Sequence, residues 1–385
     1  MNTTEFNRLM QLNFYVHNSL FPFLLNQDIV LTDKLRELIK AIEISEIDKF
    51  VRLKSKGFAG RPPADRIQFA RAFIAKAVFN LSTTNQLIER LTYDNTLRVI
   101  CGFSTTHNLP DKSSFSRAFK EFSEYKLPEI THQSFIKNHL SNVLFESVSH
   151  DSTAIESREK AIKKSKEIEG NTNNTTVDEP KKKRGRPSKE ALEKKKMMQQ
   201  IQETPISFID AQRKKSVAEN IQNLPKVAAY SCKKNSKGFK TTWLGYKLHI
   251  STAPGDIPIS CILTSASVHD SQVMVPLMQE TTSKIDYCYD LADAGYCSKS
   301  LREASLELGH VPLIDHNPRR ADKKEFEAFE AIKYKARSGV ERVNAHLKDF
   351  HGGRNIWVKG AEKVMTHLMF GVLVITVEQT LRFAT

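Results

Sequence analysis

Apolar residues in the first third of the chain recur at intervals of three, four and seven, which is the spacing of amphipathic helices. Residues 35–51 and 67–77 carry this pattern. A third helix is predicted where Thr83 and Gln86 fit a capping box, and a fourth begins after Leu109. Short helices with basic and hydroxyl residues at their starts fit a helix-turn-helix module and a plain helical bundle equally well.

From about residue 143 the spacing becomes that of strands. Strands are predicted at 144–151, 244–251, 259–264, 285–292 and 311–315, with a turn at 254–258 and helices at 271–279, 299–308 and 334–350. A strand, an antiparallel hairpin and two more strands flanked by helices can build one mixed sheet covered by helices. We therefore predict an α/β protein, with an all-α domain at 1–140 and a mixed-sheet domain at 141–385.

Two acids stand where predicted strands end. Asp151 closes the first strand, and Asp293 directly follows the fourth. If these strands are parallel neighbours, both acids emerge at the same carboxyl edge, where open sheets place ligands. Each acid also suits a turn. Asp290 is a rival ligand, whereas Asp270 is expected to cap the helix that follows it.

A third acid lies on the helix predicted at 334–350. At 100° per residue, Tyr334, Arg337, Glu341 and Lys348 fall within about 60° of arc. The opposite face carries Ala336, Val340, Val343, Leu347 and Phe350. The polar stripe fits an ordinary solvated face with neighbouring ion pairs, or a surface that receives a phosphodiester.

The net charge of +14 is concentrated in one segment. Residues 157–240 hold 22 Lys and Arg against 10 Asp and Glu, which favours a polyanionic partner. Within the segment, Arg184, Gly185, Arg186 and Pro187 form the core of an AT-hook-like motif, in which Arg-Gly-Arg inserts into a narrow A·T-rich minor groove. A solvated linker is the alternative. Either way, we expect the insertion to lack structure without DNA.

The remaining composition limits which metal sites, disulfides and cellular compartment are expected for the chain. Five cysteines, an odd number without CxxC spacing, argue against disulfides and a zinc knuckle. His346 and His351 are five apart, a poor spacing for co-ligation from one helix face, so no zinc is expected. No run of apolar residues long enough for a membrane span and no signal pattern is seen, and we expect an intracellular protein without a membrane partner.

Three neighbouring acids repel one another unless a cation joins them. Two divalent ions held by carboxylates would activate a water or a 3′-hydroxyl and stabilise the leaving oxygen of a phosphodiester. Magnesium suits this role, because it accepts a few carboxylates and takes phosphate oxygens as further ligands.

These motifs give the chain a family resemblance. It resembles bacterial insertion-sequence transposases of the DDE class, which have an RNase H-like catalytic domain. Their Y-x2-R-x3-E-x6-K signature is matched by Tyr334, Arg337, Glu341 and Lys348, their D-x-G-Y motif by 293–296, and their D-[GS]-T motif by 151–153. The block at 60–119 also resembles their helical N-terminal domain, and we expect the all-α domain at 1–140 to bind DNA.

The resemblance implies catalytic and metal-binding roles for Asp151, Asp293 and Glu341, with two Mg²⁺ or Mn²⁺ ions. It implies DNA contacts for Tyr334 and for the two cations of its signature. We expect a cytoplasmic, nucleoid-associated enzyme that binds double-stranded DNA as a dimer, cleaves the terminal inverted repeats and joins them to target DNA. A nuclease without strand joining and an inactive DNA-binding regulator are the alternatives.

The chain departs from the best-known members in one respect. They carry a β-rich insertion before the glutamate helix, but only 18 residues separate Asp315 from Tyr334 here. Any residues that act from that insertion cannot be assigned in this chain.

Overall fold

The computed structural model describes residues 31–52, 64–160, 207–234, 238–318, 322 and 324–384. Its N-terminal part is helical, as the spacing predicts. The helices are α3 (Asp33–Ser45), η1 (Ile47–Phe50), α4 (Arg66–Val78), α5 (Thr84–Tyr93), α6 (Asn95–Cys101), α7 (Lys112–Glu124) and α8 (Leu127–His139). The predicted capping box of Thr83 and Gln86 is present at the start of α5. Buried phenylalanines of α4 and α7 meet edge to face, for example Phe69 and Phe115 with ring centroids 4.8 Å apart.

The second half contains a six-stranded mixed sheet. Its strands are β1 (Leu144–Glu156), β2 (Ala229–Lys234), β3 (Lys240–Ala253), β4 (Ile257–Ser265), β5 (Asp286–Ala292) and β6 (Val311–Ile314). β3 pairs antiparallel with β1, β2 and β4, whereas β1, β5 and β6 run parallel. The predicted α/β architecture is therefore confirmed, and the arrangement is that of an RNase H-like sheet preceded by a helical region.

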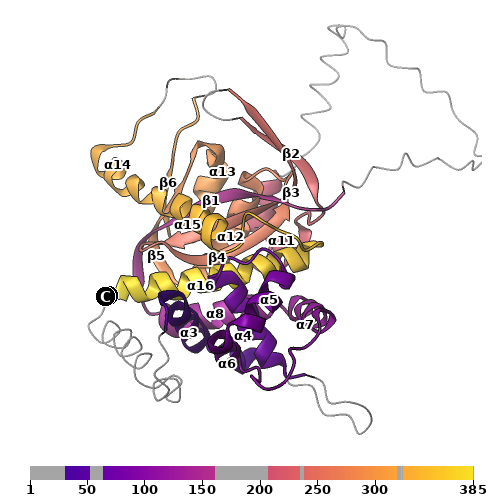
Figure 1. The fold of residues 1–385 in the computed structure, drawn as a ribbon. Coiled ribbons are helices and arrows are strands. Elements are labelled where there is room, and N and C mark those ends of the chain that lie inside the picture. The colour runs from indigo at the N-terminus through magenta and orange to yellow at the C-terminus, as the bar shows by residue number, and fades with distance from the viewer. Residues whose placement is uncertain are drawn as a thin grey trace, which may run out of the picture.

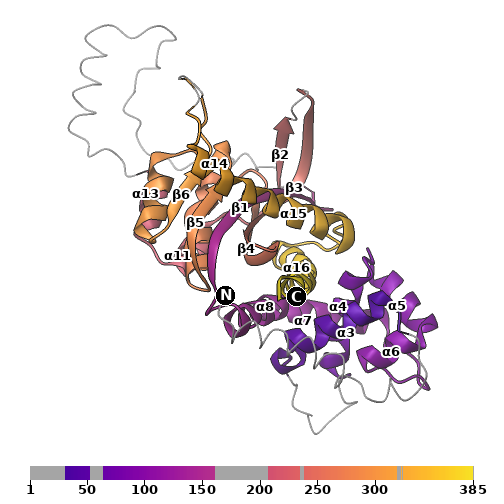
Figure 2. The same ribbon diagram turned by 90° about the vertical axis from the view of Figure 1, so that its left-hand side faces the viewer.

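Helices cover both faces of this sheet (Figures 1 and 2). One side carries α12 (Ser271–Thr282) and α13 (Lys299–Glu307), and the other carries α15 (Ser338–Phe350) and α16 (Ala361–Ala384). Alternate residues of β3 point to opposite faces of the sheet, which explains why different helices cover the two sides. Leu248 and Ile250 pack into the apolar core with α15 and α16, and His249 between them faces the opposite way toward Asp270.

No element is predicted after residue 350, yet α16 is the central helix of the molecule. It lies between the sheet and the N-terminal helices (Figure 1) and adds residues to three apolar cores. It is long and apolar enough to cross a membrane by length and composition, but 83% of its most apolar window is buried. A helix that is apolar on all sides belongs in an interior, and α16 fills that place here.

Two regions differ from the predicted elements. The segment expected to lack structure contains α10 (Phe208–Arg213), α11 (Val217–Asn223) and β2 in its described part at 207–234. These elements form because Ser207 and Ser216 cap the two helices and the buried side chain of Asn220 bonds to α12 through Gln279. The expectation of a structureless insertion is therefore wrong for 207–234.

The helix predicted at 334–350 is not continuous. α14 (Ala328–Tyr334) ends where a 3₁₀ turn, η3 (Lys335–Arg337), leads into α15. The turn changes the helical phase, so Ala336 is exposed instead of buried, and Phe350 is also exposed at the end of α15. Val340, Val343 and Leu347 are buried as predicted.

Candidate active site

The register of β1 and β5 places the first two acids side by side. His150 pairs with Ala292 as the last matched residues of the two parallel strands, so Asp151 and Asp293 follow at the same level of the sheet edge. β1 does not end at Asp151 as predicted, because it continues to Glu156 in antiparallel pairing with β3. This continuation also excludes a turn as the setting of Asp151.

The environment of Asp151 disfavours its negative charge. Burial raises its pKa to about 6, and the neighbouring charge of Asp293 acts in the same direction. The backbone N–H of Ser152 and the cations Arg337 and Lys233 oppose this rise. Two neighbouring carboxylates at a partly buried sheet edge repel each other, so this position favours a bound cation.

The turn after β5 explains the spacing of the Asp-Ala-Gly-Tyr motif. Gly295 donates its backbone N–H to Asp293 Oδ1 over 2.9 Å. A Cβ on Gly295 would lie 2.9 Å from that same oxygen, so any side chain there would displace the acid. Tyr296 is fully buried in an apolar core with residues of α12 and α13, which anchors the turn. The glycine and the tyrosine therefore hold Asp293 in one orientation.

The third acid is connected to the aspartates through the helix that carries it. Glu341 Oε1 accepts a 2.6 Å hydrogen bond from Arg337 Nη2, and its side chain is 56% exposed. Burial lowers the pKa of Arg337, but Tyr334 and the charges of Glu341, Asp151 and Asp293 outweigh it and raise that pKa. Arg337 thus lies within electrostatic reach of all three acids. One turn after Glu341, buried Asn344 donates to Asp151 Oδ2 over 3.3 Å.

The other signature residues fall into two groups. Tyr334 donates its hydroxyl to the carbonyl oxygen of Ala292 over 3.2 Å, which fastens the end of α14 beside Asp293. Burial, together with nearby acids, raises the pKa of Tyr334 to about 12.

Lys348 lies apart from this contact. Burial lowers its pKa, and the charges of Arg354 and Lys233 lower it further. We call Lys348, Arg354 and Lys233 the basic strip, and its member Lys233 also lies within electrostatic reach of Asp151.

The rival ligand Asp290 is excluded by its surroundings. It is completely buried and accepts hydrogen bonds from His150 Nε2 at 2.8 Å, Tyr287 Oη at 2.8 Å and Ser305 Oγ at 2.5 Å. Burial raises its pKa, but the bonds from His150 and Ser305 outweigh this and lower it. His150 directly precedes Asp151, so this network fixes the backbone beneath the first acid.

Asp270 has a different role from the predicted one. It occupies the N-cap position of α12, yet its side chain makes no capping hydrogen bond. It accepts from Lys247 Nζ over 2.9 Å and also bonds to Ser152. The helix-capping prediction is therefore wrong, and Asp270 supports the strand that carries Asp151.

Sequence reasoning missed two residues of the site. Lys233 lies in β2, inside the segment whose charge composition predicted no structure. Asn344 shares the buried face of α15 with Val340 and Val343, where a polar residue in an apolar stripe was the available signal. The AT-hook-like residues Arg184, Gly185, Arg186 and Pro187 lie outside the described residues.

Two protein-family models match the chain. Residues 24–121 match the family described as a transposase domain (DUF772), and residues 203–376 match the family described as a transposase DDE domain. The two ranges together span most of the chain, with α3 to α6 in the first and five of the six strands in the second, whereas α8 and β1 lie outside both. No curated protein and no solved structure matches the chain.

Proposed function

The chain belongs to the DDE transposases of insertion sequences, polynucleotidyl transferases that act on DNA, and we propose that it cleaves the ends of its own element and joins them to target DNA. It would bind the terminal inverted repeats in the bacterial cytoplasm, on the nucleoid. The observation that carries this proposal is the adjacency of Asp151 and Asp293 beside the helix of Glu341.

We assign the metal-binding role to Asp151, Asp293 and Glu341. Enzymes with this domain use divalent ions, and Mg²⁺ or Mn²⁺, two per site, suits three carboxylates. The donor set fits, since burial and Asp293 together disfavour the charge on Asp151, and a cation would relieve both effects. When bound, the ions would supply Lewis-acid activation of the attacking oxygen and charge stabilisation of the leaving one.

Arg337 holds the acids together before metal enters. Its bond to Glu341 is an i,i+4 pair on a half-exposed side chain, and such pairs are worth less than about 1 kcal/mol. Glu341 can therefore exchange this partner at little cost. Arg337 is then free to contact a phosphate of the DNA end, for which its planar fork is suited.

The basic strip positions the DNA backbone. Lys348 lies within electrostatic reach of Arg354 and Lys233, and Lys233 also acts on Asp151. Lysine and arginine contacts to phosphates fix the register of a duplex without reading its sequence.

In the reaction, a water or 3′-hydroxyl oxygen forms a bond to phosphorus while the P–O3′ bond breaks. Because joining needs two ends held together, we also propose a dimer on DNA.

A strand-transfer assay tests this proposal. Duplex oligonucleotides that carry the ends of the element are mixed with the full chain, Mg²⁺ or Mn²⁺, and a target plasmid. Metal-dependent cleavage at the ends followed by joining is the expected result. Cleavage without joining would replace the proposal with a nuclease, and end binding without cleavage would replace it with a regulator.

A further inference from the structure

A second group of metal-ligand side chains lies where α15 and α16 meet the N-terminal helices. His346 is on α15, His351 directly follows that helix, and Glu378 is on α16. One potential ligand atom from each lies within 4.8 Å of the others. His346 Nε2 is 4.0 Å from Glu378 Oε2, and the two imidazole rings have centroids 4.8 Å apart. We propose that these three residues bind one divalent transition-metal ion of the Zn²⁺ class.

His351 carries the strongest indication. Its side chain is buried, with 1% of the residue exposed, and its Nδ1 lies 3.3 Å from the carbonyl oxygen of Ala77 in α4. That contact assigns the ring proton to Nδ1 and leaves the lone pair on Nε2. Nε2 is buried without a hydrogen-bond partner in the described structure. Metal-binding histidines commonly donate their other ring N–H to a carbonyl in this way.

The protonation of both histidines suits a metal ligand, because only the neutral imidazole offers a lone pair. Burial lowers the pKa of His351 to about 3, and the neighbouring His346 acts in the same direction. Burial also lowers the pKa of His346, although Glu378 opposes this. Glu378 keeps Oε2 available, because Arg382 donates to its other oxygen, Oε1.

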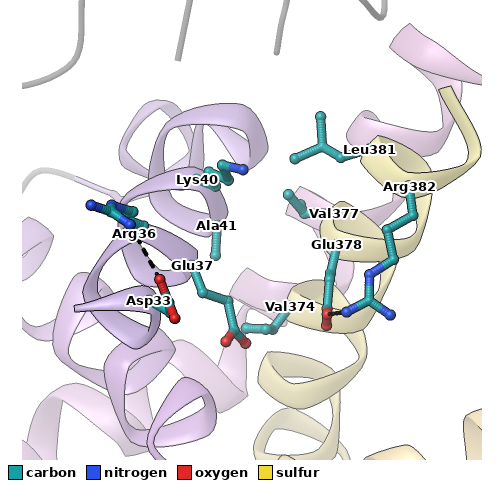
Figure 3. Close-up of a pocket in the computed structure, with 10 residues that line it drawn as sticks. All are labelled: Asp33, Arg36, Glu37, Lys40, Ala41, Val374, Val377, Glu378, Leu381 and Arg382. Carbon is teal, nitrogen blue, oxygen red and sulfur yellow. Dashed lines mark hydrogen bonds and ion pairs between the residues drawn. The ribbon is translucent and has the colours of Figure 1, made fainter. Parts of the chain in front are cut away.

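A cavity adjoins this group at Glu378. It lies between α3 and α16, and its lining includes Glu37, Val374, Glu378 and Arg382. Glu37 and Glu378 extend into it from the two helices (Figure 3). Among the described residues Glu37 Oε1 is buried without a hydrogen-bond partner. Burial is the main cause that raises the pKa of Glu37, and the charge of Glu378 adds to it. Glu37, or a water from the cavity, would complete the coordination.

The spacing that argued against zinc assumed that both histidines lie on one helix. α15 ends at Phe350, and the backbone of His351 has φ −130°, outside the helical region. This departure turns the second imidazole toward the first. In a tetrahedral site with bonds of about 2.0–2.1 Å, ligand atoms are roughly 3.4 Å apart, so these atoms, which lie within 4.8 Å of one another, would approach by up to about 1.4 Å. His346 is partly exposed and can make this movement.

The proposed ion would fasten the catalytic helix. His346 lies on the same helix as Glu341, Glu378 lies on the central helix, and His351 contacts α4. A metal at this point would join three segments that are far apart in the sequence. It is independent of the acids at the sheet edge, and its role is structural.

The test uses the full chain after metal removal with a chelator. Excess Mg²⁺ occupies the acid site, and Zn²⁺ binding is followed by calorimetry, with Co²⁺ as a spectroscopic probe of tetrahedral geometry. We expect about one Zn²⁺ per chain and a raised Tm. His346→Gln and Glu378→Gln, both at partly exposed side chains, should each weaken Zn²⁺ binding by about 10-fold or more and abolish the Tm shift.

His107→Gln is the matched control, because His107 lies on an exposed loop of the helical region. It should bind Zn²⁺ as the unchanged chain does, and circular dichroism checks that every variant is folded. Absence of Zn²⁺ binding would overturn the proposal, and so would binding that neither substitution weakens. A loss of stability in His346→Gln without any Zn²⁺ binding would identify a plain His346–Glu378 ion pair instead.

Discussion

Asn344 donates a hydrogen bond from Nδ2 to Asp151 Oδ2 over 3.3 Å. This bond connects the helix that carries Glu341 to the strand that carries the first acid. Because Asn344 lies one turn beyond Glu341 on α15, it sets how closely that helix approaches the sheet edge. Asn344 is therefore a positioning residue of the site.

Replacing Asn344 should weaken the assembly of the acids. We expect Asn344→Ala to lower the cleavage rate by about 10-fold, equivalent to about 1.4 kcal/mol, and to raise the Mg²⁺ concentration needed for half-maximal cleavage. Binding to the DNA ends should not change. The measurement is a Mg²⁺ titration of cleavage, with Ala345→Ser, on the exposed side of the same helix, as control. An unchanged Mg²⁺ requirement would contradict the positioning role.

Lys348 is expected to contact a phosphate. Lys348→Ala should reduce the slope of log K against log[salt] for DNA binding by about 1, because one fewer counterion is released. The slope is measured by fluorescence anisotropy over a salt series. Lys137→Ala is the control, since Lys137 is exposed on α8, near the opposite end of β1. Equal slopes for the two variants would count against this contact.

The raised pKa of Asp151 predicts a pH-dependent cost in stability. Burial, with help from Asp293, raises it from 3.8 to about 6 in the folded chain. The folded state therefore holds the proton more tightly, and stability is lost as pH rises through about 6. Without metal, Asp151→Asn should raise the free energy of unfolding by about 3 kcal/mol at pH 7.5 and by about half of that at pH 5.

Thermal unfolding of the chelator-treated protein measures this gain at both pH values. Asp286→Asn is the control, because Asp286 is exposed at the opposite end of β5. It should leave the free energy of unfolding nearly unchanged. A gain for Asp151→Asn that is the same at both pH values would show that the carboxylate is not strained by its surroundings.

The strands that carry the two aspartates were predictable because the alternation that marks a strand is local, although β1 continues past Asp151 to Glu156. Alternation marked the strands, and parallel pairing of β1 and β5 then put Asp151 and Asp293 at one edge. The central helix α16 was missed for the opposite reason. Its apolar residues surround the helix and leave no periodic pattern, so only its packing on both sides reveals it.

Tertiary contacts explain the other differences. The charge of the segment before β3 favoured disorder, but α10 is held by Arg213, which pairs with Glu303 and Glu307 of α13. Those partners are about 90 residues away and cannot be read from local composition. Likewise, the 3₁₀ turn before α15 lies where Ser149 bonds to the carbonyl oxygen of Ala336, a contact from a distant strand.

The basic segment at 181–196 remains a predicted DNA contact. Deleting it should weaken binding to DNA and flatten the salt dependence, because its clustered lysines and arginines would release counterions. Deleting the uncharged residues 170–177 instead is a control that shortens the same part of the chain without removing charge. The measurement is DNA affinity over a salt series. If both deletions give the slope of the intact chain, this segment has no electrostatic role in binding.

The central claim is that Asp151, Asp293 and Glu341 act as one metal-dependent site. The most direct measurement is the rate of cleavage at the DNA ends with Mg²⁺ for Asp151→Asn, Asp293→Asn and Glu341→Gln. Each should lose activity by on the order of 10³-fold or more while end binding is retained. Asp256→Asn, at a turn acid that pairs with Arg342, should stay within about twofold. Near-normal cleavage by any of the three variants would contradict the account.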